Sequence, residues 1–171
     1  PQFDAEEWTL SNGAKVIYRK ADFEKEDVTL VAYSPGGTSQ YDDLDLLPAA
    51  ASLGNFVPAY GLGDYDIVAF QKLLTGKQAM CNVKLSSLYE NIQGSSIPKD
   101  FETMMQMVYL HFVQPRFDSV THNVQIERNH IQVKQMEGQP RKIMSDSITR
   151  ITTNYNPRVQ LFDDHYVDRI T

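Results

Sequence analysis

The chain of 171 residues has the length of one domain, and its 42% apolar and 22% charged residues are typical of a globular protein. Its 22 acidic residues outnumber its 16 basic residues, which gives a net charge of −6 at neutral pH. Because nucleic acids and anionic membrane surfaces are bound through a basic surplus, this charge argues against both as partners. Cys81 is the only cysteine, which excludes an intrachain disulfide and a zinc site made of cysteines.

The sequence starts at Pro1 and shows no basic segment followed by the apolar stretch of a signal peptide. We therefore expect residues 1–171 to form a single domain that is an excised piece of a longer chain. The uncharged stretch from Leu46 to Gly63 has about the length of a membrane span. Its prolines and glycines favour instead a helix of a globular domain followed by a loop, and we expect no membrane span.

Strands are predicted in the first third of the chain. Asn12-Gly13 lies between two β-rich runs and predicts a hairpin of residues 8–10 and 14–20. Residues 28–33 are apolar at both odd and even positions, which predicts a central strand covered on both sides. Pro35-Gly36-Gly37 ends that strand.

Helical spacing begins after this break. Apolar residues at steps of three and four predict a helix over 46–60, with Pro48 in its first turn. Asp66 is a predicted cap of a second helix, and Gly76 is placed to end it.

The second half adds two strands, over 79–85 with Cys81 pointing inward and over 88–94, and then three helices. Pro98 opens the first helix, which stops before Pro115; the others cover 118–137 and 141–154. The predicted core face of the first helix consists of Phe101, Met104, Met105, Val108 and Phe112. Strands joined by hairpins, with helices between and after them, predict an α+β fold in which helices pack on one face of an antiparallel sheet.

The histidines do not have the spacing of a metal site. A zinc pair on one helix needs two histidines four residues apart, and the nearest pair, His122 and His130, lies eight residues apart. On a straight helix their rings are about 12 Å apart along the axis, so they cannot share an ion. We predict surface or half-buried helical positions for all four histidines. These are His111, His122, His130 and His165.

Two glycine motifs and Cys81 also have simple interpretations. Gly61-Leu62-Gly63 resembles the start of a dinucleotide fingerprint, but Asp66 occupies the place of its third glycine and no strand precedes it. Gly36-Gly37-Thr38-Ser39 lacks the lysine of a phosphate loop, so we predict a turn. Cys81 next to a histidine base could be a nucleophile, but its alternating strand favours a small buried hydrophobic residue.

The remaining clusters are acidic and sulfur-containing side chains. Asp42, Asp43 and Asp45 lack the glycine-centred loop of a calcium site, and the preference of helix starts for acidic residues explains them. Met104, Met105 and Met107 are predicted to fill the core. The residues therefore assign no catalytic, cofactor-binding or metal-binding side chain in this chain.

Four segments follow one another in the sequence as an L-x-N-G hairpin, a strand ending in G-G-S/T, a D-x-E helix start and a P-x-F break. They are residues 10–16 (LSNGAKV), 33–39 (YSPGGTS), 94–102 (GSSIPKDFE) and 109–118 (YLHFVQPRFD). In this order they resemble the pitrilysin/insulinase family of zinc metallopeptidases. The resemblance implies the α+β domain of this family, as in mitochondrial processing peptidase, in a chain that is C-terminally incomplete because it ends before the domain's last strand.

Active domains of the family carry the inverted zinc motif H-x-x-E-H on the helix that follows the Gly-Gly strand. In this sequence that helix corresponds to residues 46–60, which contain neither His nor Glu, and the first histidine of the chain is His111. The resemblance therefore implies a non-catalytic copy, with zinc bound in a catalytic domain elsewhere in the parent protein. It further implies homologous domains or a catalytic subunit as partners, a peptide substrate, and the bacterial periplasm or cell envelope as location.

Two functional hypotheses follow from the resemblance. In the first, the domain forms part of the wall of the closed chamber in which a zinc endopeptidase encloses and positions peptides. In the second, it is a structural or binding subunit with no peptidase partner, like the inactive members that accompany processing peptidase or respiratory complexes. An H-x-x-E-H motif elsewhere in the parent chain would favour the first. An independent enzyme would need a convergent pocket that the sequence does not reveal.

Overall fold

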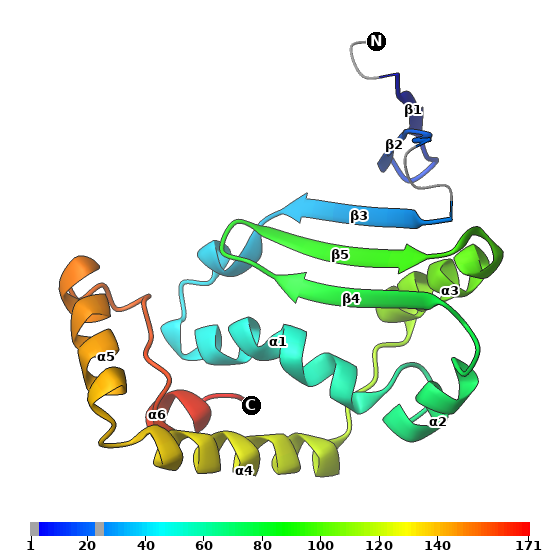
Figure 1. The fold of residues 1–171 in the computed structure, drawn as a ribbon. Coiled ribbons are helices and arrows are strands. Elements are labelled where there is room, and N and C mark those ends of the chain that lie inside the picture. Colours follow the sequence, from blue (N-terminus) through cyan, green and yellow to red (C-terminus); the bar gives the residue numbers. More distant parts are fainter. Residues whose placement is uncertain (1–3, 23–25) are drawn as a thin grey trace.

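The computed structural model describes residues 4–22 and 26–171, and its centre is a three-stranded antiparallel sheet (Figure 1). The strand order is β3 (Val28–Pro35), β5 (Tyr89–Ser96) and β4 (Ala79–Leu85). In this register Leu30 and Cys81 lie on either side of Gly94. The α+β fold with an antiparallel sheet is confirmed.

The predicted central position of the strand over 28–33 is wrong. β3 is at the edge of the sheet and β5 is in the centre. Val31 and Tyr33 on one face of β3 are 59% and 74% exposed. A continuous apolar run is compatible with burial of both faces of a strand. It does not determine whether residues of this chain cover both faces.

Two helices, α1 (Leu47–Tyr60) and α3 (Phe101–Val113), pack on the same face of the sheet. α3 meets β5 at Met104, which is fully buried, and at Gly94 of the strand. A Cβ atom on residue 94 would lie 2.8 Å from the Met104 Sδ atom, so the Met104 side chain takes this position because residue 94 is a glycine. Burying a methionine side chain of this kind stabilises a fold by about 1.5–3 kcal/mol.

The buried face of α3 differs from the predicted one. Met104 and Met107 are buried, whereas Met105 is 37% exposed and Phe112 is 72% exposed. Met107 belongs to the main core cluster with Leu62, Cys81 and Ile92. The prediction that the methionines fill the core is thus confirmed for Met104 and Met107 and wrong for Met105. The apolar stripe of α3 is wider than the helix surface that contacts the sheet, so residues at the edge of the stripe stay exposed.

The connection from α1 to α2 (Ile67–Leu73) turns sharply at Gly61, whose φ of +86° lies in the left-handed region. A Cβ atom there would lie 2.2 Å from the Tyr65 carbonyl oxygen. Asp66 caps α2 by accepting the backbone N–H of Ala69 at 2.7 Å, as predicted. Pro58 lies inside the last turn of α1, so Gly61 and not Pro58 marks the end of that helix.

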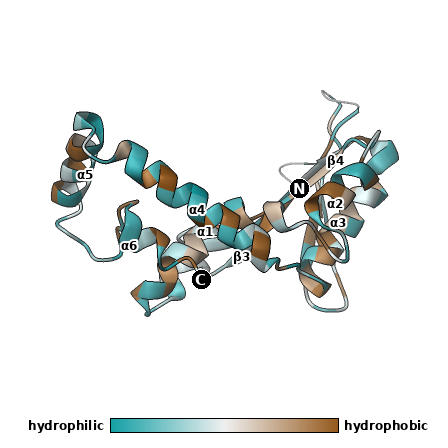
Figure 2. Cartoon of the chain, turned by 90° about the horizontal axis from the view of Figure 1, so that it is seen from below, coloured by the Kyte–Doolittle hydropathy of each residue, from teal (hydrophilic) through white to brown (hydrophobic). Residues whose placement is uncertain are grey.

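On the side of α1 that faces away from the sheet lie α4 (Ser119–Met136) and the short α6 (Asp164–Val167), while α5 (Pro140–Thr152) projects from the body (Figures 1 and 2). Phe56 and Tyr60 of α1 form a second core cluster with Ile170, which follows α6. The sequence did not predict α6, because four residues are too few for a periodic signal. None of the helices in residues 4–22 and 26–171 combines the length and apolar character of a bilayer-spanning segment.

The predicted hairpin forms from β1 (Glu6–Thr9) and β2 (Lys15–Tyr18), but it is a separate two-stranded sheet. Asn12 and Gly13 form its turn, where the Asn12 side chain accepts the Ala14 backbone N–H at 3.0 Å. In Figure 1 the hairpin stands beyond the β3 edge of the three-stranded sheet.

A buried carboxylate ties the start of α3 to the start of β4. Asp100 is 2% exposed, accepts the backbone N–H of Gln78 at 2.9 Å and lies 3.2 Å from the Lys77 ammonium nitrogen. The Gln78 hydrogen bond, followed by the bond and charge of Lys77, lowers the pKa of the Asp100 carboxyl below its ordinary value, although burial opposes this.

The Asp100→Asn variant is expected to lower the Tm at pH 7 by roughly 2–4 °C, because it removes the charge that Lys77 and Gln78 stabilise. A lowered pKa means that the unfolded chain binds more protons, so this contribution is complete above about pH 4 and disappears as the pH falls through the folded-state pKa. Thermal unfolding of both proteins between pH 3 and 7 measures this. The exposed Asp42→Asn is the control, and a Tm difference that does not change with pH would contradict the assignment.

Candidate functional site

Helix α1 corresponds to the helix that the sequence resemblance compares with the zinc-binding one, and here it packs against the sheet. α1 reads LPAAASLGNFVPAY and contains no side chain that commonly binds zinc. Its small residues allow close contact with the sheet instead: a Cβ atom on Gly54 would lie 3.6 Å from the Val83 carbonyl oxygen of β4. Phe56 and Tyr60 extend from the same helix toward α4.

All four histidines lie on helices, as predicted, and three of them are half-buried. The His122 Nδ1 atom and the Tyr60 hydroxyl share a hydrogen bond of 2.8 Å, inside a cluster with the rings of Phe56 and Phe117. Burial, with the nearby Asp118 carboxylate, raises the pKa of the Tyr60 hydroxyl. The hydroxyl therefore stays protonated at neutral pH, and the pair joins α1 to α4.

The other histidines also make structural contacts. His111 Nδ1 donates to the Met107 carbonyl oxygen at 2.8 Å. His130 on α4 lies between two carboxylates of the α6 region, 2.7 Å from Asp164 and 3.4 Å from Asp168. Within the described residues no three His, Cys, Asp or Glu side chains converge as metal ligands would.

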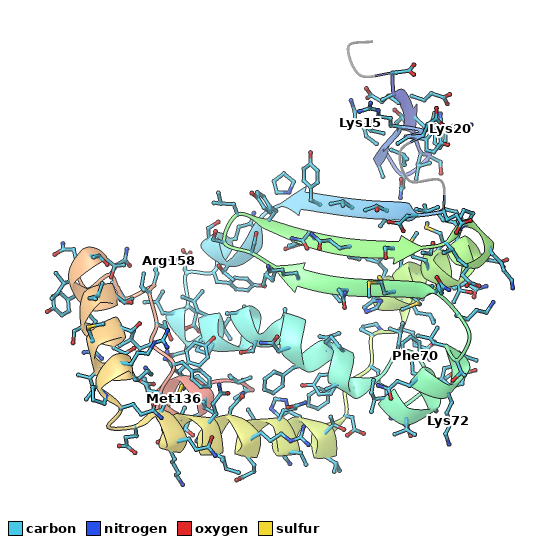
Figure 3. The ribbon with its side chains drawn as sticks, in the orientation of Figure 1. Lys15, Lys20, Phe70, Lys72, Met136 and Arg158 are labelled. Atoms are coloured by element: carbon cyan, nitrogen blue, oxygen red, sulfur yellow. The ribbon has the colours of Figure 1, made fainter. Side chains whose placement is uncertain are left out.

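The acidic cluster and the glycine loop hold the segment after β3. Asp43 accepts the backbone N–H of Asp45 at 2.9 Å and so caps a short 3-10 turn, and Asp45 pairs with Arg169 at 3.2 Å. This agrees with the predicted role at a helix start. Arg158, labelled in Figure 3, donates to the carbonyl oxygens of Thr38 at 2.6 Å and Tyr41 at 2.9 Å. The predicted turn at Gly36–Ser39 is thus fixed by the C-terminal segment.

Cys81 is 8% exposed within the main core cluster, as predicted for a buried hydrophobic residue. Burial raises the pKa of its thiol to about 11. Because the thiolate is the nucleophile, a thiol with this pKa is inert at neutral pH.

The side of the sheet opposite α1 and α3, which we name the open face, is not covered by a helix of the described residues. Directly paired residues of an antiparallel sheet point to the same side, so the register defines its members. It consists of Thr29, Val31, Tyr33, Met80, Asn82, Lys84, Tyr89, Asn91, Gln93 and Ser95. The rings of Tyr33 and Tyr89 lie edge to face, 6.4 Å apart, and are 74% and 48% exposed.

The open face combines exposed aromatic rings with amide and hydroxyl groups. Tyrosine offers a large rigid apolar area and a polar tip, and for this reason it is enriched at protein interfaces. The amides of Asn82 and Gln93 can each donate to and accept from a peptide backbone. These groups are of the types found on surfaces that contact polypeptides.

No protein-family model and no curated protein matches the sequence, but solved structures match the fold. The periplasmic protease PqqL from Escherichia coli superposes with a TM-score of 0.80 and 17% identity, over 98% of this chain and 18% of PqqL. The ferredoxin protease FusC, solved in complex with Arabidopsis ferredoxin, superposes with a TM-score of 0.73 and 15% identity, over 99% of this chain and 19% of FusC.

A third structure carries a directly relevant description. It is a peptidase M16 inactive domain from Pseudomonas fluorescens, with a TM-score of 0.64 and 17% identity over 85% of this chain and 35% of that one. The chain has the fold of an M16 peptidase domain. The M16 proteases are pitrilysin-like, so the fold implied by the sequence resemblance is confirmed. The chain spans about a fifth of the length of the two proteases it matches.

The sequence reasoning missed the open face. The prediction that residues 28–33 are covered on both sides leaves no exposed surface at Val31 and Tyr33, which are in fact exposed. The signal that could have found the face is the run of polar residues at alternate positions of the paired strands, from Asn82 and Lys84 to Asn91 and Gln93.

The Cys81 thiol is expected to react with iodoacetamide at pH 8 at least about 100-fold more slowly in the folded chain than in urea. With a pKa of about 11, roughly one thiol in a thousand is ionised at this pH, and the core also blocks access. Labelling followed by mass spectrometry measures the rate, with the urea-unfolded chain as the control. Rapid stoichiometric labelling of the native protein would contradict the burial of Cys81.

Proposed function

We propose that this chain is a non-catalytic domain of an M16-type zinc metalloendopeptidase and that its open face forms part of the chamber wall that holds peptide substrates. The observation that carries the proposal is the match of 98% of the chain to PqqL, combined with an α1 helix that has no zinc ligand. Zinc and the water-activating base would then be supplied by another domain of the longer protein.

The geometry of the open face supports a role in positioning. A wall that contacts an extended peptide through aromatic rings and amides can fix its orientation and exclude water, and both effects raise the rate without any catalytic side chain. FusC was solved with a protein, ferredoxin, bound to it. By extension we propose a polypeptide substrate for the longer protein that contains this chain.

Alanine substitution at Tyr33 or Tyr89 in the longer protein is expected to lower kcat/KM for a fluorogenic peptide about 3- to 10-fold, mainly through KM. Each change removes a ring that contacts substrate in the ground state and in the transition state alike. Tyr109→Ala is the matched control, because Tyr109 is 64% exposed on α3, away from the open face. Steady-state kinetics with the three variants measure the effect.

Zinc content identifies which half of the proposal fails. About one equivalent of zinc in the longer protein and none in residues 1–171 is the expected result. A longer protein without zinc and without peptidase activity would replace the proposal by the structural-subunit hypothesis. A zinc-dependent peptidase whose KM is unchanged by the Tyr33 and Tyr89 variants would retain the family role and remove the chamber-wall role.

A further inference from the structure

A cleft lies between α1, α4 and the segment around α6, on the side of α1 that faces away from the sheet (Figure 1). It has a volume of about 290 Å³, and we name it the amide cleft. Four carboxamides and one hydroxyl, from both α1 and α4, line it. They belong to Ser52, Asn55, Gln125, Asn129 and Gln132. Because α1 and the sheet lie between this cleft and the open face, the two are separate surfaces.

The carboxamides of α4 form a row along the helix. Gln125, Asn129 and Gln132 follow one another at steps of four and three residues, which places them on one face of α4. Gln125 and Asn129 are separated by about 6 Å along the helix axis, at the helical rise of about 1.5 Å per residue. In an extended polypeptide the groups that point to one side repeat every two residues, or about 6.8 Å. The row therefore has nearly the repeat of an extended backbone.

The carboxamides of the amide cleft have no partner inside the domain. Within residues 4–22 and 26–171 none of the four makes a side-chain hydrogen bond, whereas His122 and His130 on the same helix are both bonded. Each carboxamide has two N–H donors and one carbonyl acceptor. Gln125 and Asn129 are half-buried, so these groups lie at the wall of the cleft. The cleft thus presents several unpaired donors and acceptors together.

Two aromatic rings of the C-terminal segment form another wall of the amide cleft. Phe162 and Tyr166 lie edge to face with ring centroids 5.7 Å apart, and both are half-buried. Two contacts fix this wall. Asp163 accepts the Tyr166 backbone N–H at 2.8 Å, and His130 of α4 lies 2.7 Å from Asp164. The rings are therefore held in place relative to the carboxamides of α4.

No charged side chain lines the amide cleft in the part of the chain that the structure describes. A charged group that entered it would lose hydration without meeting a counter-charge, which is costly. Peptide bonds and the side chains of Asn, Gln, Ser and Thr are neutral and can exchange hydrogen bonds with water for bonds with the carboxamides. The cleft therefore favours an uncharged polar ligand with an apolar part that contacts the rings.

We propose that the amide cleft binds an extended, uncharged segment of a separate polypeptide. Backbone amides of the segment pair with the carboxamides of α4, and an apolar side chain packs against Phe162 and Tyr166. Roughly three residues in extended conformation span the distance from Gln125 to Gln132. The inference goes beyond the proposed function, because it assigns a second polypeptide-binding surface that does not depend on the open face.

Fluorescence anisotropy with the longer polypeptide that contains this chain tests the proposal. The probe is a short fluorescein-labelled peptide of alternating Gln and Ser around a central Leu, measured in EDTA so that a zinc peptidase does not hydrolyse it. Two further probes carry Glu or Lys in place of every Gln. Both charged probes should bind at least about 5-fold more weakly than the neutral probe. A Lys probe that binds more tightly would assign the binding to the acidic surface of the chain and would overturn the proposal.

Substitutions of similar size on α4 locate the bound probe. Gln125→Met and Asn129→Leu remove donors and acceptors, and together they should raise the Kd of the neutral probe about 5- to 30-fold. Asn123→Leu is the matched control, because Asn123 is exposed on the opposite face of α4, and it should leave the Kd unchanged. Asn55→Leu on α1 is an independent second variant that should raise the Kd about 3-fold. The Tm of each variant verifies that it folds.

Absence of probe binding would overturn the proposal, as would equal changes in Kd for the Gln125→Met/Asn129→Leu variant and for Asn123→Leu. Weaker binding in Tyr33→Ala, with no effect of the α4 variants, would assign the probe to the open face instead. Displacement of the probe by maltohexaose would assign the cleft to a saccharide instead. None of these results depends on zinc or on peptidase activity, so the proposal can fail while the proposed function stands, and the reverse.

Discussion

The contact between Met104 and Gly94 is the constraint on which the rest of the structure depends. Gly94 lies in the middle strand of the sheet, and the absence of a side chain there lets α3 approach until the Met104 sulfur reaches the strand. The neighbouring residues Leu30 and Cys81 then meet the helix from both sides. A side chain at position 94 would meet the Met104 Sδ atom at 2.8 Å and the Met80 carbonyl oxygen at 3.3 Å, so the Met104 side chain would have to leave its buried position.

The helices α4 and α6 are joined to α1 and to each other by aromatic and polar contacts. Tyr60 and Phe56 connect α1 to His122 of α4, while His130 connects α4 to α6. Arg158 fixes the loop after β3 from the far end of the chain. The histidines and acidic residues, which by type could have made an active site, are thus used for joining helices.

The two faces of the main sheet have different roles for a physical reason. One face carries small and aliphatic side chains at alternate positions and is closed by α1 and α3. The open face carries tyrosines and amides, which are stable in water and can also be buried against a polypeptide. The sheet thus has one face covered by helices of this chain and one face that no helix of the described residues covers.

Much of this protein was determined by local sequence signals. The helix caps at Asp66 and Asp118, the hairpin turn at Asn12-Gly13 and the inward position of Cys81 depend on residues close in sequence, and all are as predicted. The tertiary structure alone decided which strand is central, which face of α3 is buried and where the hairpin stands. Those outcomes depend on which distant segments come into contact, and the same apolar run in β3 or α3 is compatible with burial or with exposure. The absence of His and Glu from residues 46–60 was visible in the sequence, but only the folded sheet showed that Tyr33 and Tyr89, 56 residues apart, form one surface.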